Sequence, residues 1–551
     1  MTDDYYDLGT YERAVSTTSA DAQHWFSRGL MWTYAYHHEE AVECFEKALE
    51  SDPGLALAHW GVAYAIGPNY NRQWGDFDDD EKRLYLGRAL EAIEAATQSA
   101  AGAKPVEKAL IAALSVRYPE DPSVEDFGPW NDAYANAMRE VHKAHPADMD
   151  VSSFFAEALM NRTPWHLWDL STGEPAQGAD TLEAVYVIES AFRDLADQAA
   201  ETHPGLLHMY IHLMEMSPNP EKALEAGDAL VGLAPDAGHL QHMATHIDVL
   251  CGRYQNVVVR NDLAIAADRK YLIRSGADNF YTVYRCHNYH FKIYGAMFLG
   301  QLRPAMEAAD ELAETLTDDI VRPLADWLEP FIPMKQHVLI RFGKWEQIKA
   351  QELPQDPELH SVTTSMIHYA KTVAYAATGD IAAALSSREA FRDAKTAVPE
   401  SRMLFNNTCA DILNVAEAML EGELSYRRGD YDTAFDHLRR SVELDDALPY
   451  DEPWAWMQPA RHALGALLLE QGKTEEAEAV YRADLGLDDT LSRASQHPDN
   501  VWSLHGLHEC LVFRGATVEA RSIKRRLELA EARADVPIEA SCFCRLEATS
   551  V

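Results

Sequence analysis

The sequence predicts an all-α solenoid, a superhelix built from antiparallel helix pairs. The spacing from His208 to His242 is 34 residues, as is that from His212 to His246, and 34 residues is the period of a helix–turn–helix repeat. Stretches rich in Val, Ile and Thr with period-two alternation are few, which speaks against strands. A chain of 551 residues would suggest several domains by length alone, but a solenoid grows by adding repeats.

We expect the repeats to run along the whole chain, as a single superhelix over residues 1–550. N-terminal repeats are expected at 21–120, histidine-rich central repeats at 130–315 and C-terminal repeats at 320–530, followed by a tail at 531–551. Linkers rich in proline or acidic residues separate these groups, as is typical of the breaks between helices.

The segment Asp21–Pro53 is the clearest helix pair. The small residues Gly29, Ala41 and Ala48 allow two helices to approach closely, and Pro53 ends the second helix. Aromatic residues are expected to fill the space between the helices, namely Trp25, Trp32 and Phe45.

Helical periodicity continues beyond this pair. Gly67-Pro68-Asn69 breaks the next helix, and an irregular aromatic loop follows at 69–77, which either lines a site or packs over the end of a repeat. The segment 449–459 is too rich in proline to be helical. The other helical segments are expected at 81–118, 131–145, 150–161, 204–271, 369–397, 417–444, 459–485 and 500–530, and helix pairs are expected to continue beyond Phe291.

The charge balance restricts the classes of partner. The chain has 48 basic and 88 acidic residues, a net charge of −40. Binding to nucleic acid requires clustered Lys and Arg, and an anionic membrane surface attracts basic segments, so neither partner is expected. We interpret the acidic surface as a determinant of solubility.

Cysteine usage and the absence of targeting signals indicate a cytoplasmic protein. Seven scattered cysteines are typical of reduced thiols in the cytosol, and the Cys542/Cys544 pair is only a weak metal signal. The N-terminus lacks the basic-then-apolar pattern of a secretion signal, and no apolar run approaches about 18 residues.

Three segments between Thr202 and Phe291 carry histidines at helical spacing, the feature around which a site is expected. Residues three, four and seven apart share one helix face. Glu215 shares the face of the first stripe, and the second stripe requires a helix that begins by Gly238. The stripes comprise His208 and His212, then His239, His242 and His246, then His287 and His290.

Convergent histidines predict a transition-metal site. Neutral imidazole is the commonest protein ligand for zinc, copper, iron and nickel, and we expect iron, copper or zinc. The two His-x-x-x-His segments lack the glutamate that follows the first histidine of HEXXH metalloproteases, so that class is excluded. Seven histidines exceed the needs of one ion, so some are expected to support ligands, move protons or hold a second ion.

Carboxylates and tyrosines supply candidate catalytic groups. Glu215 is a candidate ligand or general base. Glu157, the charge within an apolar helix, needs a partner, a metal or a proton, and the sequence leaves a catalytic role and a structural pairing both open. Tyr284 flanks the third stripe, where it donates a proton, binds substrate or packs between helices. Glu452 and His462 are candidates for closing the hollow.

Seven segments spread over most of the chain have a distinctive order and spacing, namely YHHEEA (36–41), HWGVAYAIGPN (59–69), AEALMNRTPW (156–165), HPGLLHMYIH (203–212), AGHLQHMATHI (237–247), HNYHF (287–291) and PYDEPWAWMQPARHALGALLL (449–469). In these segments the chain resembles a widespread family of tetratricopeptide-repeat proteins. The resemblance implies a right-handed superhelix whose first helices line a concave surface, with the second, fifth and ninth residue of each pointing into it. It implies little about activity, but it agrees with the spacing that the seven histidines converge on a hollow.

Two functions from different classes remain open. In the first, the protein is a metal-dependent enzyme, an oxidoreductase or hydrolase, that acts on a small organic molecule in the histidine-rich hollow. In the second, it is a non-catalytic scaffold that binds a peptide or protein partner in its groove. Such grooves commonly present Lys, Arg and Asn, whereas this chain presents His, Tyr and Glu, which favours the enzyme. A third possibility is an enzyme whose histidines act without metal.

Overall fold

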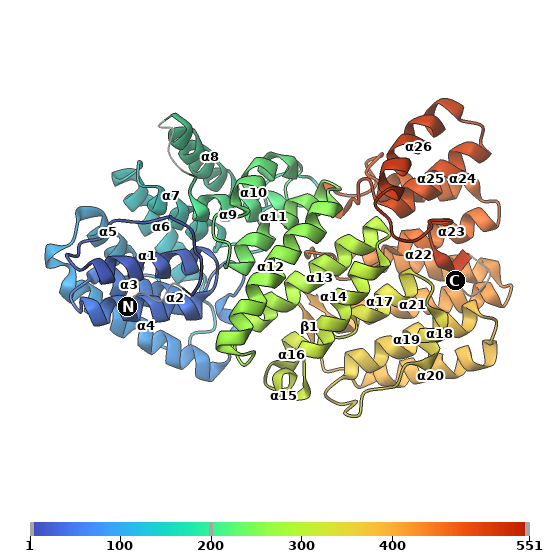
Figure 1. Ribbon diagram of the computed structural model, residues 1–551, viewed down its shortest axis with the longest axis horizontal. Coiled ribbons are helices and arrows are strands. Elements are labelled where there is room, and N and C mark those ends of the chain that lie inside the picture. Colours follow the sequence, from blue (N-terminus) through green and yellow to red (C-terminus); the bar gives the residue numbers. More distant parts are fainter. Residues whose placement is uncertain (1–4, 198–201, 546–551) are drawn as a thin grey trace. The chain divides into compact units, whose positions relative to one another are not determined.

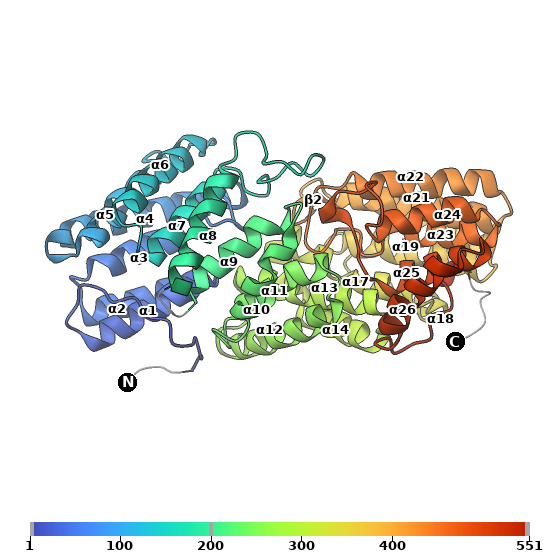
Figure 2. The same ribbon diagram turned by 90° about the horizontal axis from the view of Figure 1, so that it is seen from above.

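The structure is a computed structural model that describes residues 5–197 and 202–545, and these residues are predominantly helical (Figures 1 and 2). The predicted all-α solenoid of helix pairs is confirmed. The described residues also contain a short antiparallel hairpin that was not predicted, β1 (Met403–Leu404) paired with β2 (Asn407–Thr408). Strands of two residues are too short to leave an alternating pattern in the sequence.

The chain divides into two compact units. The first comprises residues 1–247 and 266–271, and the second comprises residues 248–265 and 272–551. Helices α11 (Gly238–Leu250) and α12 (Tyr254–Ser275) contain the points at which the chain passes from one unit to the other.

The first unit consists of helices that pair with their neighbours in sequence. These are α1 (Ala20–Tyr34), α2 (His38–Ser51), α3 (Ala56–Ile66), α4 (Asp79–Ser99), α5 (Pro105–Leu114), α6 (Gly128–Ala144), α7 (Met149–Met160), α8 (Thr181–Asp197), α9 (Pro204–Glu215) and α10 (Leu224–Leu230).

The second unit continues the same pattern. Its helices are α13 (Tyr281–Leu299), α14 (Leu302–Thr315), α15 (Asp318–Val321), α16 (Ala325–Leu328), α17 (Met334–Arg341), α18 (Trp345–Ala350), α19 (Ser361–Ala377), α20 (Ile381–Thr396), α21 (Cys409–Arg427), α22 (Tyr431–Asp446), α23 (Ala460–Glu470), α24 (Thr474–Asp484), α25 (Val501–Phe513) and α26 (Thr517–Glu531). Short 3₁₀ turns lie between and after the helices of both units, at Trp74–Asp76, Ala100–Gly102, Pro220–Ala223, Arg322–Leu324, Glu329–Phe331, Arg493–Ser495 and Phe543–Arg545.

The first helix pairs are held together by one aromatic ring between glycines. The ring of Phe45, on α2, packs against Gly29 of α1 and Gly61 of α3, where an added Cβ would collide with it. Ala41 and Ala48 are fully buried on the same helix. Glycine therefore serves here to let three helices approach one ring, as the sequence predicts for Gly29.

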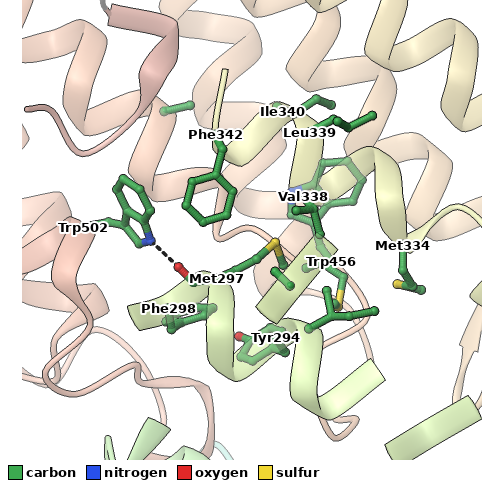
Figure 3. Close-up of a cluster of buried hydrophobic side chains, with 14 of the residues drawn as sticks. Tyr294, Met297, Phe298, Met334, Val338, Leu339, Ile340, Phe342, Trp456 and Trp502 are labelled. Carbon is green, nitrogen blue, oxygen red and sulfur yellow. Dashed lines mark hydrogen bonds between the residues drawn. The ribbon is translucent and has the colours of Figure 1, made fainter. Parts of the chain in front are cut away.

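The core of the second unit joins helices to an irregular segment. Figure 3 shows Met297 of α13, Val338 of α17 and Trp456 of the segment 449–459 brought together in one buried cluster. The indole N–H of Trp502, on α25, donates to the carbonyl oxygen of Met297 at 2.7 Å (Figure 3). The segment 449–459 contains no helix, as predicted, but it lies in the core rather than on the surface.

Near the C-terminal end of the described residues, two cysteines differ from the prediction. Cys542 and Cys544, expected as reduced thiols, form a disulfide, since the turn that they share brings their Cα atoms to 5.2 Å, within the range such a bond needs. Cys44, Cys409 and Cys510 are free thiols, as expected. Residues 546–551 of the predicted tail lie outside the described residues, as do residues 1–4 and 198–201. Among the described helices, none is both long and apolar enough to cross a membrane.

Candidate metal centre

Helix α9 carries the first stripe of histidines. Pro204 takes its first position, where the missing N–H costs nothing, and the ring of His203 caps the helix by accepting the N–H of Leu206 on Nδ1 at 3.1 Å. The helix then places His208 and His212 one turn apart, and both side chains are fully buried.

Helix α11 carries the second stripe. It begins at Gly238, as the prediction required, so His239, His242 and His246 fall on one face. One ring nitrogen from each of His208, His212 and His239 lies within 4.8 Å of the other two. The residues that sequence spacing placed on neighbouring repeats are therefore close together in the first unit.

A hydrogen bond fixes the ring of His208. Its Nδ1 lies 2.7 Å from the carbonyl oxygen of Tyr34. A carbonyl oxygen only accepts, so Nδ1 carries the proton and Nε2 keeps its lone pair. Nε2 is buried and has no hydrogen-bond partner within the described part of the chain.

Glu215 fixes two further rings. One carboxylate oxygen accepts from Nδ1 of His212 at 2.9 Å, and the other accepts from Nδ1 of His246 at 2.7 Å. Nε2 of His212 is buried and, among residues 5–197 and 202–545, has no hydrogen-bond partner. Nε2 of His246 lies 2.8 Å from Nε2 of His242. The carboxylate thus orients imidazoles from two helices so that their Nε2 atoms are presented on the other side of each ring.

Burial keeps these imidazoles neutral. Desolvation lowers the pKa of His208 to about 3, against the opposing effect of the hydrogen bond to the Tyr34 carbonyl. Desolvation and the neighbouring histidines also lower the pKa of His212 well below its usual value. Both groups therefore hold a lone pair, the form that binds metal, at physiological pH.

Aromatic residues enclose the cluster. The ring of Tyr36 lies 4.5 Å from that of His208 and 5.7 Å from that of His239, measured between centroids. Tyr70 lies 5.0 Å and Trp165 lies 5.9 Å from His212 by the same measure. The aromatic loop 69–77 thus contributes Tyr70 to the surroundings of the histidines, while Trp74 of the same loop packs on Phe127 at 4.8 Å between centroids. That the loop lines a functional site stays a prediction.

Two of these aromatic residues have strained backbones. The φ angle is +52° at Tyr36 and +59° at Trp165, a region that bulky residues rarely adopt. Such strain costs about 1–3 kcal/mol and persists where surrounding structure enforces it, often at functional sites. The sequence places Tyr36 and Trp165 within the motifs 36–41 and 156–165, but nothing in the local sequence signals that either residue adopts a left-handed backbone.

Glu157, on α7, is buried next to the hydroxyl groups of two tyrosines. It accepts a hydrogen bond from the hydroxyl of Tyr64 and a longer one, at 3.4 Å, from that of Tyr36. Burial raises its pKa, although these hydroxyls and the guanidinium of Arg117 oppose the effect. The structure pairs Glu157 with tyrosines, and its proposed catalytic role stays a prediction.

The remaining predicted site residues belong to the second unit. The ring centroids of His287 and Phe405 lie 4.7 Å apart, and Nε2 of His290 lies 2.8 Å from the sulfur of Met457. The ring of Tyr284 stacks on that of Tyr281 at 5.7 Å. The assignment of these residues to a metal or catalytic site stays a prediction.

Two residues, His462 and Glu452, were expected to close the hollow, and both ring nitrogens of His462 make hydrogen bonds inside the second unit. Its Nδ1 accepts from Arg341 at 2.8 Å, and its Nε2 donates to Asp484 at 2.9 Å, so both ring nitrogens are bonded. Glu452 is buried in the irregular segment 449–459.

A sequence model of the tetratricopeptide repeat matches residues 37–54, which cover α2 and its flanks. This match, together with the helix pairs of the fold, confirms the resemblance to tetratricopeptide repeats that the sequence shows.

Solved structures with some likeness to the chain include yeast Tom70, with 11% identity, coverage of 92% of this chain and 99% of that chain, and a TM-score of 0.27. The APC/C hetero-tetramer Cut9-Hcn1 has 13% identity, coverage of 89% and 76%, and a TM-score of 0.28. Naa15/Naa10 bound to HypK-THB has 14% identity, coverage of 92% and 70%, and a TM-score of 0.23. Scores of this size carry no argument about function. No curated protein matches the chain.

Proposed function

We propose that the first unit binds a transition-metal ion through Nε2 of His208 and His212 and a ring nitrogen of His239. One observation carries the proposal: two buried, neutral imidazoles lack a hydrogen-bond partner for Nε2 among the described residues, and a third lies within 4.8 Å. A buried polar atom without a partner costs about 1–3 kcal/mol, so two together require an explanation such as an ion.

The supporting hydrogen bonds favour metal binding over simple packing. Histidines that bind metal nearly always donate their other N–H to a carbonyl or carboxylate, which fixes the tautomer. His208 donates to the Tyr34 carbonyl and His212 donates to Glu215, so both have this arrangement. An all-nitrogen set suits zinc, copper or iron rather than magnesium or calcium, which prefer oxygen.

We further propose that the ion makes the protein a metal-dependent enzyme that acts on a small organic molecule by redox or hydrolytic chemistry. The donor groups exceed what one ion needs, because His242 and His246 lie beside Glu215 as a second set of nitrogens. Their Nε2 atoms, 2.8 Å apart, share one proton when both are neutral, and such a pair can accept or release a proton during a reaction. The ion itself would supply charge stabilisation or electron transfer.

Elemental analysis of the untagged protein tests the metal site. We expect about one equivalent of zinc, copper or iron, lost in a His208→Ala/His212→Ala double variant and kept in His166→Ala, an exposed histidine of the same unit. The helical circular dichroism of the double variant should match that of the wild type. An absence of metal in the wild type, including after anaerobic reconstitution with each ion, would overturn the proposal and leave a scaffold that binds a peptide or protein.

Activity is tested separately from binding. The metal-loaded wild type and the double variant are compared against panels of small oxidisable and hydrolysable substrates. Turnover by the loaded wild type alone supports an enzyme. Stoichiometric metal without turnover on any panel, together with a large drop in unfolding temperature on chelation, would assign the ion to structure instead.

A further inference from the structure

The disulfide between Cys542 and Cys544 lies at a cavity of the second unit. The cavity has a volume of about 30 Å³, and both cysteines line it together with Arg341, Tyr369 and Trp456. Cys544 is buried, whereas Cys542 is only half-buried, so Cys542 is the more accessible of the two. The proposed metal centre of the first unit uses none of these residues.

This disulfide closes too short a loop to act mainly as a structural cross-link. A cross-link stabilises a protein largely by restricting the unfolded chain, and the gain grows with the number of residues in the closed loop. Phe543 alone separates the two cysteines, so the gain is close to its minimum. A chemical role for the bond therefore has to be considered beside a structural one.

Side chains from three helices hold the segment without the disulfide. Arg341, on α17, donates to the carbonyl oxygen of Ser541 at 3.2 Å, and the hydroxyls of Tyr481 and Ser541 lie 2.5 Å apart. On the other side, Arg427 of α21 donates to the carbonyl oxygen of Cys544. These bonds do not depend on the link between the sulfurs, so both cysteines are expected to stay in place when it opens, which allows it to form again.

The cavity contains a cation that no carboxylate pairs directly. Arg341 is buried, its nearest acid Asp484 is reached only through the ring of His462, and burial lowers its pKa to about 9, so it is still charged at pH 7. The carboxylate of Glu423 also lines the cavity, but Arg427 pairs with it at 2.7 Å. In such surroundings a guanidinium favours a nearby anion strongly, because little water screens its charge.

We propose that Cys542 and Cys544 are a redox-active pair that exchanges with a low-molecular-weight thiol. The thiolate is the reactive form of cysteine, and nearby cations and N–H donors stabilise it. Arg341 supplies the cation, and the N–H of Cys544 donates to Sγ of Cys542 at 3.3 Å. A single water needs about 10–15 Å³ of such space, so the cavity admits a thiol group rather than a whole molecule. This activity goes beyond the proposed function, because it uses other residues and no metal.

The exchange proceeds in two balanced steps. The thiolate of the small molecule attacks Sγ of Cys542, the bond to Cys544 breaks, and Cys544 leaves as a thiolate that takes up the proton released by the attacking thiol. A second molecule of the thiol then attacks the outer sulfur of the mixed disulfide and releases Cys542 as a thiolate beside Arg341. Two small thiols are thereby oxidised to one disulfide, and the protein disulfide is reduced; a small disulfide reverses the sequence.

The redox state of the pair can be measured in the full chain. Trypsin cleaves after Arg533 and Arg545, so both cysteines fall on the peptide 534–545, which contains no other cysteine. The native protein is incubated with reduced or oxidised glutathione at pH 7, its thiols are labelled by differential alkylation, and the peptide is weighed by mass spectrometry. We expect reduction within minutes by millimolar reduced glutathione and full recovery of the disulfide in oxidised glutathione. A bond that persists for hours in reduced glutathione, or thiols that never form it, would overturn the proposal.

The acidity of Cys542 tests the role of Arg341. In Cys544→Ser, the rate of alkylation of the same peptide against pH should give Cys542 a pKa at least about one unit below the usual value of about 8.5. Adding Arg341→Met, which removes the charge but keeps an apolar chain, should return the pKa toward about 8.5. Arg440→Met, at a side chain that is 58% exposed, is the matched control and should leave it unchanged.

The measurement on Cys544→Ser decides the question even if Arg341→Met fails to fold, which circular dichroism would show. A pKa of about 8.5 or above for Cys542 in that single variant would overturn the proposal. Failure of the first unit's metal site would leave all of these results unchanged.

Discussion

The two ends of α9 each hold a buried carboxylate against an imidazole, yet the two clusters differ in what remains unpaired. At the N-terminal end, Asp150 accepts from Nε2 of His203 at 3.2 Å, from Tyr34 at 2.5 Å and from Arg13 at 2.5 Å. At the C-terminal end, Glu215 accepts from the imidazoles of His212 and His246.

The two clusters differ in whether every ring nitrogen has a hydrogen-bond partner, which separates the structural cluster at Asp150 from the cluster at Glu215 that we propose binds metal. Both ring nitrogens of His203 are bonded, one to Asp150 and one to the N–H of Leu206, so this cluster is complete as it stands. The ring of His212 is bonded only through Nδ1, and its Nε2 has no partner among the described residues. The number of buried histidines is therefore less informative than which of their nitrogens remain available.

The largest loss of stability is expected for a substitution in the structural cluster around Asp150. Asp150→Ala leaves Arg13 and two tyrosine hydroxyls without their shared acceptor, and breaking a buried ion pair costs about 3–5 kcal/mol. Urea unfolding followed by circular dichroism measures the loss, and metal content per folded molecule should stay unchanged. Asp79→Ala, whose side chain is 88% exposed, serves as the control and should change stability by less than about 0.5 kcal/mol. A loss below about 1 kcal/mol for Asp150→Ala would contradict the structural assignment.

At the C-terminal end of α9, we expect a smaller effect, on metal affinity rather than on stability. Glu215→Gln keeps the size of the side chain but removes the charge that holds two Nδ1–H groups, so metal affinity should fall about 10–100-fold. Competition with a chelator measures the affinity. Glu225→Gln, an exposed residue of the same unit, should bind metal as the wild type does. An unchanged affinity in Glu215→Gln would mean that the carboxylate plays no part in orienting the ligands.

Glu157 provides a pH-dependent comparison with Asp150. Its pKa is raised in the folded protein, mainly by burial, so its contribution to stability is present below the unfolded value of 4.5 and is lost as pH rises through the folded value. The pKa of Asp150 shifts in the opposite direction. Burial acts to raise it, but hydrogen bonds and the charge of Arg13 outweigh burial and lower it, so the contribution of Asp150 to stability is lost as pH falls. The free energy of unfolding should therefore fall less steeply above pH 4.5 in Glu157→Gln than in the wild type. Parallel curves over pH 4–8 would refute this.

The smallest effect is expected at Tyr36. Tyr36→Phe removes the hydroxyl that donates to Glu157 at 3.4 Å but keeps the ring over His208, so stability should change by about 1 kcal/mol or less and metal affinity should not change. Thermal unfolding and chelator competition measure the two quantities. A large fall in metal affinity would show that the hydroxyl, and not only the ring, takes part in the site.

Sequence spacing predicted the helix faces but not their surroundings. The repeat period placed His208 and His212 near the histidines of α11, because equivalent positions in stacked repeats are neighbours. The roles of Tyr36 and Trp165 could not be predicted, since a positive φ in a bulky residue is imposed by tertiary packing. The contact between His290 and Met457 joins residues 167 positions apart, and no repeat period relates an irregular segment to a helix.

Glu215 also has a consequence for how the first unit opens. It ends α9 and bonds to His246 on α11, so one carboxylate couples two successive repeats. Repeat proteins commonly unfold piecewise, because each repeat contacts only its neighbours. Separation of α9 from α11 would expose a charge and two imidazoles in a single step, which raises the cooperativity of this stretch. Hydrogen exchange should therefore report α9 and α11 as one protected block within the chain, rather than as two repeats that open independently.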